Sequence, residues 1–530
     1  MDDRIRCTDM VEHNIELCTA IDQPSSNATA LSFIDTLCTR IVDVPSTSDF
    51  KTQVASSTRT STSTDPIESM SHVDCPVVVV PYLDFHKNFA KSDPAKWHVN
   101  DSLRDSIPTH GKNMSSNSIE YEINTTTREI IKTAIKNLHS YTIKTSLAIK
   151  PGENWVSVIL KIKVNGEDEN QKKTRLNFFV KVAPTELGIR NFFLVKEMFQ
   201  REAYVYNKVI PEFISIQKIN NVNEIFQPFV KFYGCSLTEF NEVIVMDDMS
   251  SLGYRSHDAQ KYVDYEHALM YMKTIGKFHA LAFAVQDQRP ALFNEFKRNT
   301  KEPILTNNSA GVIRKTVYDL FCQGIERLNL EGYTNEYNKY KQLIERFPNI
   351  ILEVLSYRDP GSCIVINHGD CQIRNVLFKY EDAAAPNRPT NICLLDWQVC
   401  FIGPPAYDIS LFLFLNSNKS LRDKHYHHLI NEYYASLSQF LIQLGSDPKK
   451  MIPFNSLQES LKKFSLFGVF VGIWLSLGKV YKIDEHPEIF TTADQNEMAD
   501  QFKKHPQNSD VYFNVVRDIL LDYISYGYDI

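Results

Sequence analysis

The stretch INHGDCQIRNVLFKY, residues 366–380, limits the fold more than any other part of the chain. Its second half is rich in residues that favour a β-strand, from Val376 to Tyr380. Its first half is polar, and burying such groups costs free energy unless each finds a partner. The sequence therefore predicts a strand that begins where polar groups converge, namely His368, Asp370, Arg374 and Asn375.

A second acidic stretch, CLLDWQVCFIGPPAYD at residues 393–408, follows closely. An apolar run ends there in Asp396, and the link EDAAAPNRPT before it is rich in turn residues. The two strands can therefore pair as a hairpin that brings Asp396 towards Asn375. For one aspartate alone, capping of the next turn would be a sufficient explanation.

Phosphoryl transfer explains Asp370, Asn375 and Asp396 together. This reaction uses a carboxylate to orient the attacking hydroxyl and accept its proton, and oxygen ligands for the magnesium ion of the nucleotide. Asp370 fits the first role. Asn375 and Asp396 fit the second, because a metal ion would compensate the charge of an aspartate placed beside an apolar run.

Two charged residues upstream lie on apolar faces. Lys181 in RLNFFVKV alternates with apolar residues of a predicted strand, and Glu202 lies one helical turn from both Phe199 and Tyr206. Either residue alone could be a surface charge whose stem covers apolar neighbours. Taken with the downstream motif, they favour a lysine–glutamate ion pair that links the strand to the helix.

Composition excludes several classes of protein. The chain has 530 residues with 43% hydrophobic and 23% charged residues, which is typical of a multi-domain globular protein. Its net charge of -7 gives no general attraction to nucleic acid, so we expect no such partner. The N-terminus has no secretory signal, the ten cysteines form no CxxC pair, and no apolar run predicts a membrane span. We therefore expect a cytoplasmic protein.

The order of predicted elements divides the chain into three parts. Residues 1–115 are rich in Ser and Thr, and we expect a largely disordered arm. Residues 116–249 read as strands with helices, and residues 250–530 are mainly helical around the polar motif. The prediction is an α+β protein with a small β-rich lobe, a larger helical lobe and a ligand cleft between them.

Weaker signals lie at the edges of this cleft. The turn KPGENWVS offers phosphate donors at Gly152, Asn154 and Ser157. The bend MDDMS offers main-chain groups to an adenine ring at Asp247, Asp248 and Met249. Asp408 precedes an apolar helix, where the default interpretation is an N-cap. The aromatic run at residues 464–474 fits either plain core or the wall of an acceptor pocket, and core is the simpler interpretation.

On these motifs the chain is identified as a member of the insect ecdysteroid-kinase-like family. That family belongs to the choline kinase and aminoglycoside phosphotransferase branch of protein-kinase-like folds. HGDCQIRN resembles its catalytic loop and LLDWQVCFIGPPAYDIS its metal-binding segment. GENWVS, FFVKV, FQREAYVY and VIVMDDM resemble its phosphate turn, lysine strand, glutamate helix and hinge, and TIGKFHALAFA resembles the helix after the hinge. The resemblance covers about residue 120 to the C-terminus; the hinge departs from it by reading Asp-Asp for Glu-Asp, and the N-terminal arm has no counterpart.

The resemblance implies a two-lobed kinase that uses ATP and Mg²⁺ to phosphorylate a small-molecule hydroxyl, such as that of an ecdysteroid or a hydroxylated xenobiotic. It makes Asp370 the catalytic base, Asn375 and Asp396 metal ligands, Lys181 the phosphate-binding residue and Glu202 its partner. His368 and Asp408 would support the catalytic loop. The alternative is a pseudokinase that binds nucleotide without phosphotransfer, but this class would have lost at least one of Lys181, Asp370, Asn375 and Asp396. A protein kinase is disfavoured by the absence of GxGxxG and by His-Gly-Asp in place of His-Arg-Asp.

Overall fold

The computed structural model describes residues 123–148, 157–185, 190, 194–306, 311–356, 363–382, 384–385, 387–480, 506–528 and 530. The chain divides between Val77 and Val78, and every described residue belongs to the part after this division. The arm expected at residues 1–115 lies outside the described residues, as do Gly152 and Asn154.

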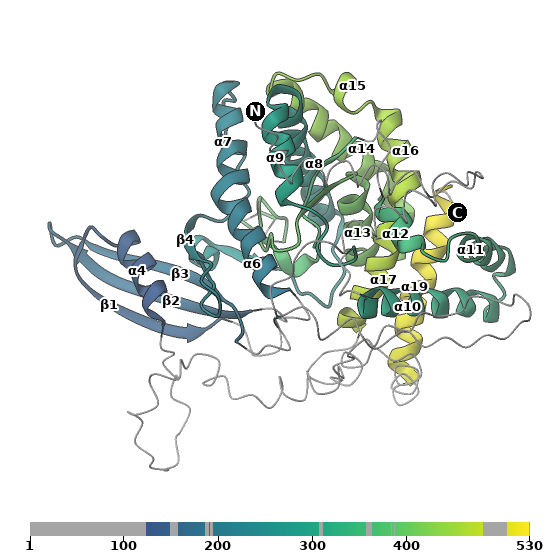
Figure 1. The fold of residues 1–530 in the computed structure, drawn as a ribbon, viewed down its shortest axis with the longest axis horizontal. Helices are drawn as coiled ribbons and strands as arrows, with labels where there is room; N and C mark the ends of the chain where they lie inside the picture. Colours follow the sequence, from purple (N-terminus) through teal and green to yellow (C-terminus); the bar gives the residue numbers. More distant parts are fainter. Residues whose placement is uncertain are drawn as a thin grey trace, which may run out of the picture. The chain divides into compact units, whose positions relative to one another are not determined.

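The first lobe is a five-stranded antiparallel sheet in the order β1-β2-β3-β5-β4. Helix α4 covers one face, where its Ile131 packs with Ile162, Phe178 and Val180 in a small core. Residues alternate across each strand, so the neighbouring Lys181 lies on the other face. That face meets the long helical segment α6–α7, which lies between the sheet and the remaining helices (Figure 1). The elements are α4 (Thr125–Ala134), β1 (Leu138–Leu147), β2 (Val158–Asp168), β3 (Lys173–Val182), α6 (Val195–Tyr204), α7 (Ile210–Ile219), β4 (Phe232–Ser236) and β5 (Val243–Asp247).

The connection to the second lobe runs through a short 3₁₀ turn, Met249–Leu252, and the strand β6 (Tyr254–Ser256). The predicted boundary between the parts 116–249 and 250–530 falls inside this turn. That the two lobes are separate domains with this boundary stays a prediction. Strand β6 pairs with β8, so the first strand after the hinge is already part of the second lobe.

The second lobe is mainly helical and holds two small sheets, β10–β7 and β6–β8–β9. Strands β8 and β9 are antiparallel neighbours, which confirms the predicted hairpin. The elements are α8 (Tyr265–Gln288), α9 (Pro290–Asn299), α10 (Gly311–Leu330), α11 (Thr334–Arg346), α12 (Ile350–Leu355), β7 (Val365–Asn367), β8 (Val376–Lys379), β9 (Asn391–Leu394), β10 (Phe401–Gly403), α13 (Ala406–Asn416), α14 (Lys419–Gln443), α15 (Pro448–Met451), α16 (Phe454–Phe464), α17 (Leu466–Val480) and α19 (Pro506–Ser525). The predicted α+β class with a small sheet lobe and a large helical lobe is confirmed.

The core of this lobe surrounds α13 and α17. A Cβ atom on Gly468 of α17 would lie 2.5 Å from the backbone carbonyl carbon of Ser410 in α13, so glycine is what lets the two helices touch. Residues 466–473 of α17 are all buried, so this part of the aromatic run is core, while Trp474 at its end is half-buried. Within the described residues, no single helix is both long and apolar enough to cross a membrane. The helical segments 448–464 and 466–480 are long and apolar enough only when they are taken together, and they are bent by 50° where they meet.

Candidate active site

The polar residues singled out in the sequence gather where β3 and α6 face the loops that flank β8 and β9. Lys181 Nζ lies 2.7 Å from Glu202 Oε2 and 2.7 Å from Asp396 Oδ1. The contact with Glu202 lies within the first lobe, and the contact with Asp396 joins the first lobe to the second. The amide of Gln398 adds a third partner, with its Oε1 3.0 Å from Nζ. Lys181 therefore joins the sheet, the helix α6 and the β9 loop at one point.

Burial sets the charge states of this cluster. Burial alone would lower the pKa of Lys181, but the carboxylates of Asp396 and Glu202 outweigh it and hold this pKa above its ordinary value. Burial raises the pKa of Glu202 to about 7, against the opposing effect of Lys181. Lys181 is thus held in its protonated, positively charged form, and a group that binds phosphate needs this charge.

Asp370 lies in the loop between β7 and β8, which ends in the 3₁₀ turn Ile373–Asn375. Its Oδ1 accepts a hydrogen bond from Gln372 Nε2 at 2.9 Å, and its Oδ2 accepts one from Asn375 Nδ2 at 2.8 Å. Burial, and then the nearby charge of Asp396, raise the pKa of Asp370. A carboxylate with a raised pKa, held in a fixed direction, has the properties of a general base.

The backbone of this loop is fixed by Asp408. Its Oδ2 accepts from the backbone N–H of His368 at 2.6 Å, and its Oδ1 from that of Gly369 at 3.0 Å. The expected N-cap role is therefore wrong: Pro405 is the N-cap of α13, and Asp408 lies in the first turn, fully buried. Burial alone would raise the pKa of Asp408, but the imidazoles of His279 and His368 help to hold it below its ordinary value.

His368 and Gly369 complete the turn before Asp370. His368 Nε2 lies 2.8 Å from the carbonyl oxygen of Leu395, which ties this turn to the residue before Asp396. Gly369 has φ of +82°, and a Cβ atom there would lie 2.3 Å from the carbonyl oxygen of Val399. Only glycine fits this position without strain.

Asn375 and Asp396 are the two residues whose side-chain oxygens could hold a metal ion. The amide nitrogen of Asn375 donates to Asp370 O and Asp370 Oδ2, so its oxygen is the atom left to bind a metal ion. Asp396 has φ of +65°, a left-handed conformation that aspartate tolerates better than most residues. A backbone hydrogen bond of 2.9 Å from Leu395 N to Asn375 O holds the two segments together.

This donor set fits Mg²⁺ that is bound together with nucleotide phosphates. Mg²⁺ prefers oxygen ligands and usually takes only one or two from the protein. Among the described residues, no group of three or more His, Cys, Asp and Glu side chains forms a self-sufficient metal site. A two-oxygen site completed by phosphate agrees with both observations.

The hinge side chains have structural partners of their own. Asp247 Oδ1 accepts from the hydroxyl of Tyr233 at 2.6 Å, and Asp248 Oδ1 accepts from Ser250 N at 3.0 Å. Each carboxylate thus has a structural partner, and the adenine contact expected here through main-chain groups stays a prediction. Ser157 immediately precedes β2, and its hydroxyl is buried without a hydrogen-bond partner among the described residues.

Three supporting residues were missed in the sequence. Gln398 binds Lys181, while the side chain of Asn416 accepts from Ile373 N at 3.0 Å and donates to Cys371 O at 2.7 Å. His279 lies between Asp408, 3.3 Å away, and the hydroxyl of Tyr433, 2.7 Å away. For His279, its position in the apolar run KFHALAFA was a signal. Gln398 and Asn416 gave none, because their partners are distant in sequence.

Comparison with known protein families identifies the family of this chain. Residues 151–446, more than half of the chain, match the model of a family described as the ecdysteroid kinase-like family. This range contains Lys181, Glu202, Asp370, Asn375 and Asp396. No curated protein matches the chain.

Proposed function

Because the chain belongs to the ecdysteroid kinase-like family, we propose that it transfers the γ-phosphoryl group of ATP to a hydroxyl group of a small molecule, with Mg²⁺ as cofactor. One observation carries this proposal: the half-buried carboxylate of Asp370 is held by Asn375, while Lys181 bridges Glu202 and Asp396 in the same site. A base, a pair of metal ligands and a phosphate-binding cation are the parts that phosphoryl transfer uses.

Each residue has a defined task in this proposal. Asp370 orients the acceptor hydroxyl and accepts its proton as the new bond to phosphorus forms. Lys181 binds the nucleotide phosphates and is held in place by Glu202. Asn375 and Asp396 hold the magnesium ion, which neutralises the phosphate charge when bound. His368 and Asp408 fix the loop, and Ser157 with the backbone at Met249 contacts the nucleotide.

Membership of the family indicates the chemical class of the acceptor and does not identify the compound. We expect a hydroxylated small molecule, such as an ecdysteroid or a hydroxylated xenobiotic. A cytoplasmic location, where ATP and Mg²⁺ are available, remains a prediction, as does the absence of a nucleic-acid partner.

The decisive experiment compares the wild type with Asp370→Asn. Each purified protein is incubated with ATP, Mg²⁺ and an insect metabolite extract that contains ecdysteroids, and mass spectrometry identifies species that gain one phosphoryl group. We expect a product with the wild type and a rate lower by about 100-fold or more with Asp370→Asn, the usual contribution of a general base. ATP binding should be the same in both.

Asp382→Asn serves as the matched control, because Asp382 is an exposed aspartate in the link after β8. It should retain the wild-type rate. Wild-type turnover by Asp370→Asn would refute the role of Asp370. A wild-type protein that binds ATP but yields no product and hydrolyses no ATP would instead establish the pseudokinase.

A further inference from the structure

Arg374 is a cation in the catalytic loop for which the proposed chemistry has no task. It is exposed and immediately precedes the metal ligand Asn375. Among the described residues, its guanidinium makes no hydrogen bond and no ion pair. It extends towards the end of α17, since a Cβ atom on Gly478 would lie 3.8 Å from Arg374 Nη2.

Lys479, the next residue of α17, is a second cation in the same place. Its side chain is half-buried, and its Nζ lies 4.3 Å from the centre of the Tyr262 ring. Its hydrogen bond is a long one, 3.5 Å to the carbonyl oxygen of Leu415. No carboxylate of the described part of the chain pairs with it, and the nearby Asp258 contacts Lys261 instead, at 3.4 Å. Within the described part of the chain, Lys479 therefore has no carboxylate in ion-pair contact.

The two cations also act on each other. Burial, and then the charge of Arg374, lower the pKa of Lys479 to about 8. Two positive groups that repel each other, one of them half-buried, are unfavourable unless an anion joins them. An anion bound between them would gain two charge-assisted hydrogen bonds.

This place lies beside the catalytic loop. Leu415, which Lys479 contacts, precedes Asn416, and Asn416 bonds to the loop at Cys371 and Ile373. Arg374 lies four residues after Asp370 in the same loop. A molecule whose hydroxyl meets Asp370 would thus have its other end within reach of the two cations.

We propose that Arg374 and Lys479 form an anion-binding subsite for the acceptor, so that the acceptor carries a carboxylate, sulfate or phosphate group besides its hydroxyl. This inference rests on the proposed function. It narrows the acceptor class to acidic alcohols, such as hydroxylated acids or conjugates of hydroxylated compounds. The wall of the subsite is the ring of Tyr262.

Calorimetric titration of inorganic sulfate tests the subsite without turnover. The full-length protein is first saturated with Mg²⁺ and a non-hydrolysable ATP analogue, so that the nucleotide phosphate positions are filled. We expect sulfate to bind the wild type, and Arg374→Met and Lys479→Met each to weaken binding by about tenfold or more. Lys479→Arg should retain binding. Lys450→Met removes an exposed lysine that pairs with Asp287 on another surface and should change nothing.

A second readout links the subsite to the acceptor. For an acidic acceptor found in the extract, the same two methionine variants should raise the KM of the acceptor about tenfold and leave the KM of ATP unchanged. Equal sulfate binding by wild type and both variants would overturn the inference. So would sulfate binding that the nucleotide analogue abolishes, because the cations would then hold nucleotide phosphates. Sulfate binding that depends on both cations, in a protein without phosphotransfer, would refute the proposed function and leave the anion subsite standing.

Discussion

At the scale of single residues, the Asp408 carboxylate shows how a distant side chain can set the direction of Asp370. It accepts the N–H groups of His368 and Gly369, the two residues before Asp370, and it is itself fully buried beside His279. Its role is positional, because its carboxylate bonds to the backbone of the residues before Asp370. Loss of the Asp408 carboxylate should therefore lower both the free energy of unfolding and the rate of phosphoryl transfer.

We predict that Asp408→Asn lowers the free energy of unfolding by about 1–3 kcal/mol, because the amide accepts less strongly and one N–H loses its partner. The turnover number should fall while the KM of ATP changes little. Denaturant unfolding and steady-state kinetics measure the two effects. Since folding lowers the pKa of Asp408 below its ordinary 3.8, its contribution should persist above that pH and disappear as the pH falls through the folded value. A variant with unchanged stability at pH 7 would contradict this account.

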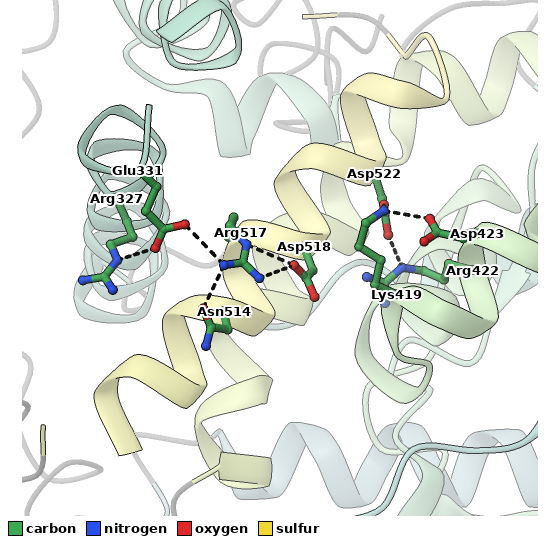
Figure 2. A network of polar contacts seen from close by, with 9 residues as sticks. All are labelled: Arg327, Glu331, Lys419, Arg422, Asp423, Asn514, Arg517, Asp518 and Asp522. Atoms are coloured by element: carbon green, nitrogen blue, oxygen red, sulfur yellow. Dashed lines mark hydrogen bonds and ion pairs between the residues drawn. The ribbon is translucent and has the colours of Figure 1, made fainter. Parts of the chain in front are cut away.

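At the scale of secondary-structure elements, the C-terminal helix α19 is held to the second lobe by charges as well as by apolar packing. Figure 2 shows Asp522 between Lys419 and Arg422 of α14. Asp522 and Arg422 are almost completely buried, with Arg422 Nε 2.6 Å from Asp522 Oδ2. Arg517 and Asp518 of the same helix form a pair that is partly exposed.

These two pairs allow a matched comparison within one helix. Asp522→Asn leaves Arg422 buried without its carboxylate, so we expect a loss of about 3 kcal/mol in the free energy of unfolding. Asp518→Asn removes a partly exposed charge and should cost about 0.5 kcal/mol. Denaturant unfolding of both variants measures the difference. Equal effects would show that packing alone, and not the buried ion pair, attaches α19.

Local sequence patterns predicted the helices and strands. The supporting side chains of the site depend on contacts between segments that are distant in sequence. Strand alternation placed Lys181 on the inner face of β3, and helical spacing placed Glu202 on the buried face of α6, so their proximity was predictable. Helix α6 continues into α7, which ends at Ile219, through a π-helical turn at Val205–Val209, and no spacing rule indicates such a turn. Gln398 and Asn416 have partners 217 and 43 residues away in sequence, and no local pattern points to such contacts. The N-cap interpretation of Asp408 failed for the same reason, since its partners belong to a loop 39 and 40 residues upstream.

At the scale of the whole molecule, the site joins the two lobes through few contacts. Lys181 of the sheet lobe contacts Asp396 and Gln398 of the helical lobe, and Arg201 of α6 donates to the carbonyl oxygen of Gln398 at 3.3 Å. A ligand that binds Lys181 on one side and Asp396 with Asn375 on the other adds a further connection. Its binding free energy is then available to hold the lobes together.

We therefore predict that Mg²⁺ and ATP together protect both lobes. At a ligand concentration about 100 times the Kd, the free energy of unfolding should rise by about 2.7 kcal/mol. Hydrogen exchange should slow in β3 and also in the β8–β9 hairpin, because the ligand contacts both. With Asp396→Asn, or with a chelator that removes Mg²⁺, the slowing should be lost in the hairpin and persist in part in β3, where Lys181 still binds phosphate. Protection confined to the sheet lobe in the wild type with Mg²⁺ present would mean that Asn375 and Asp396 hold no metal ion, and the assignment of these two ligands would be wrong.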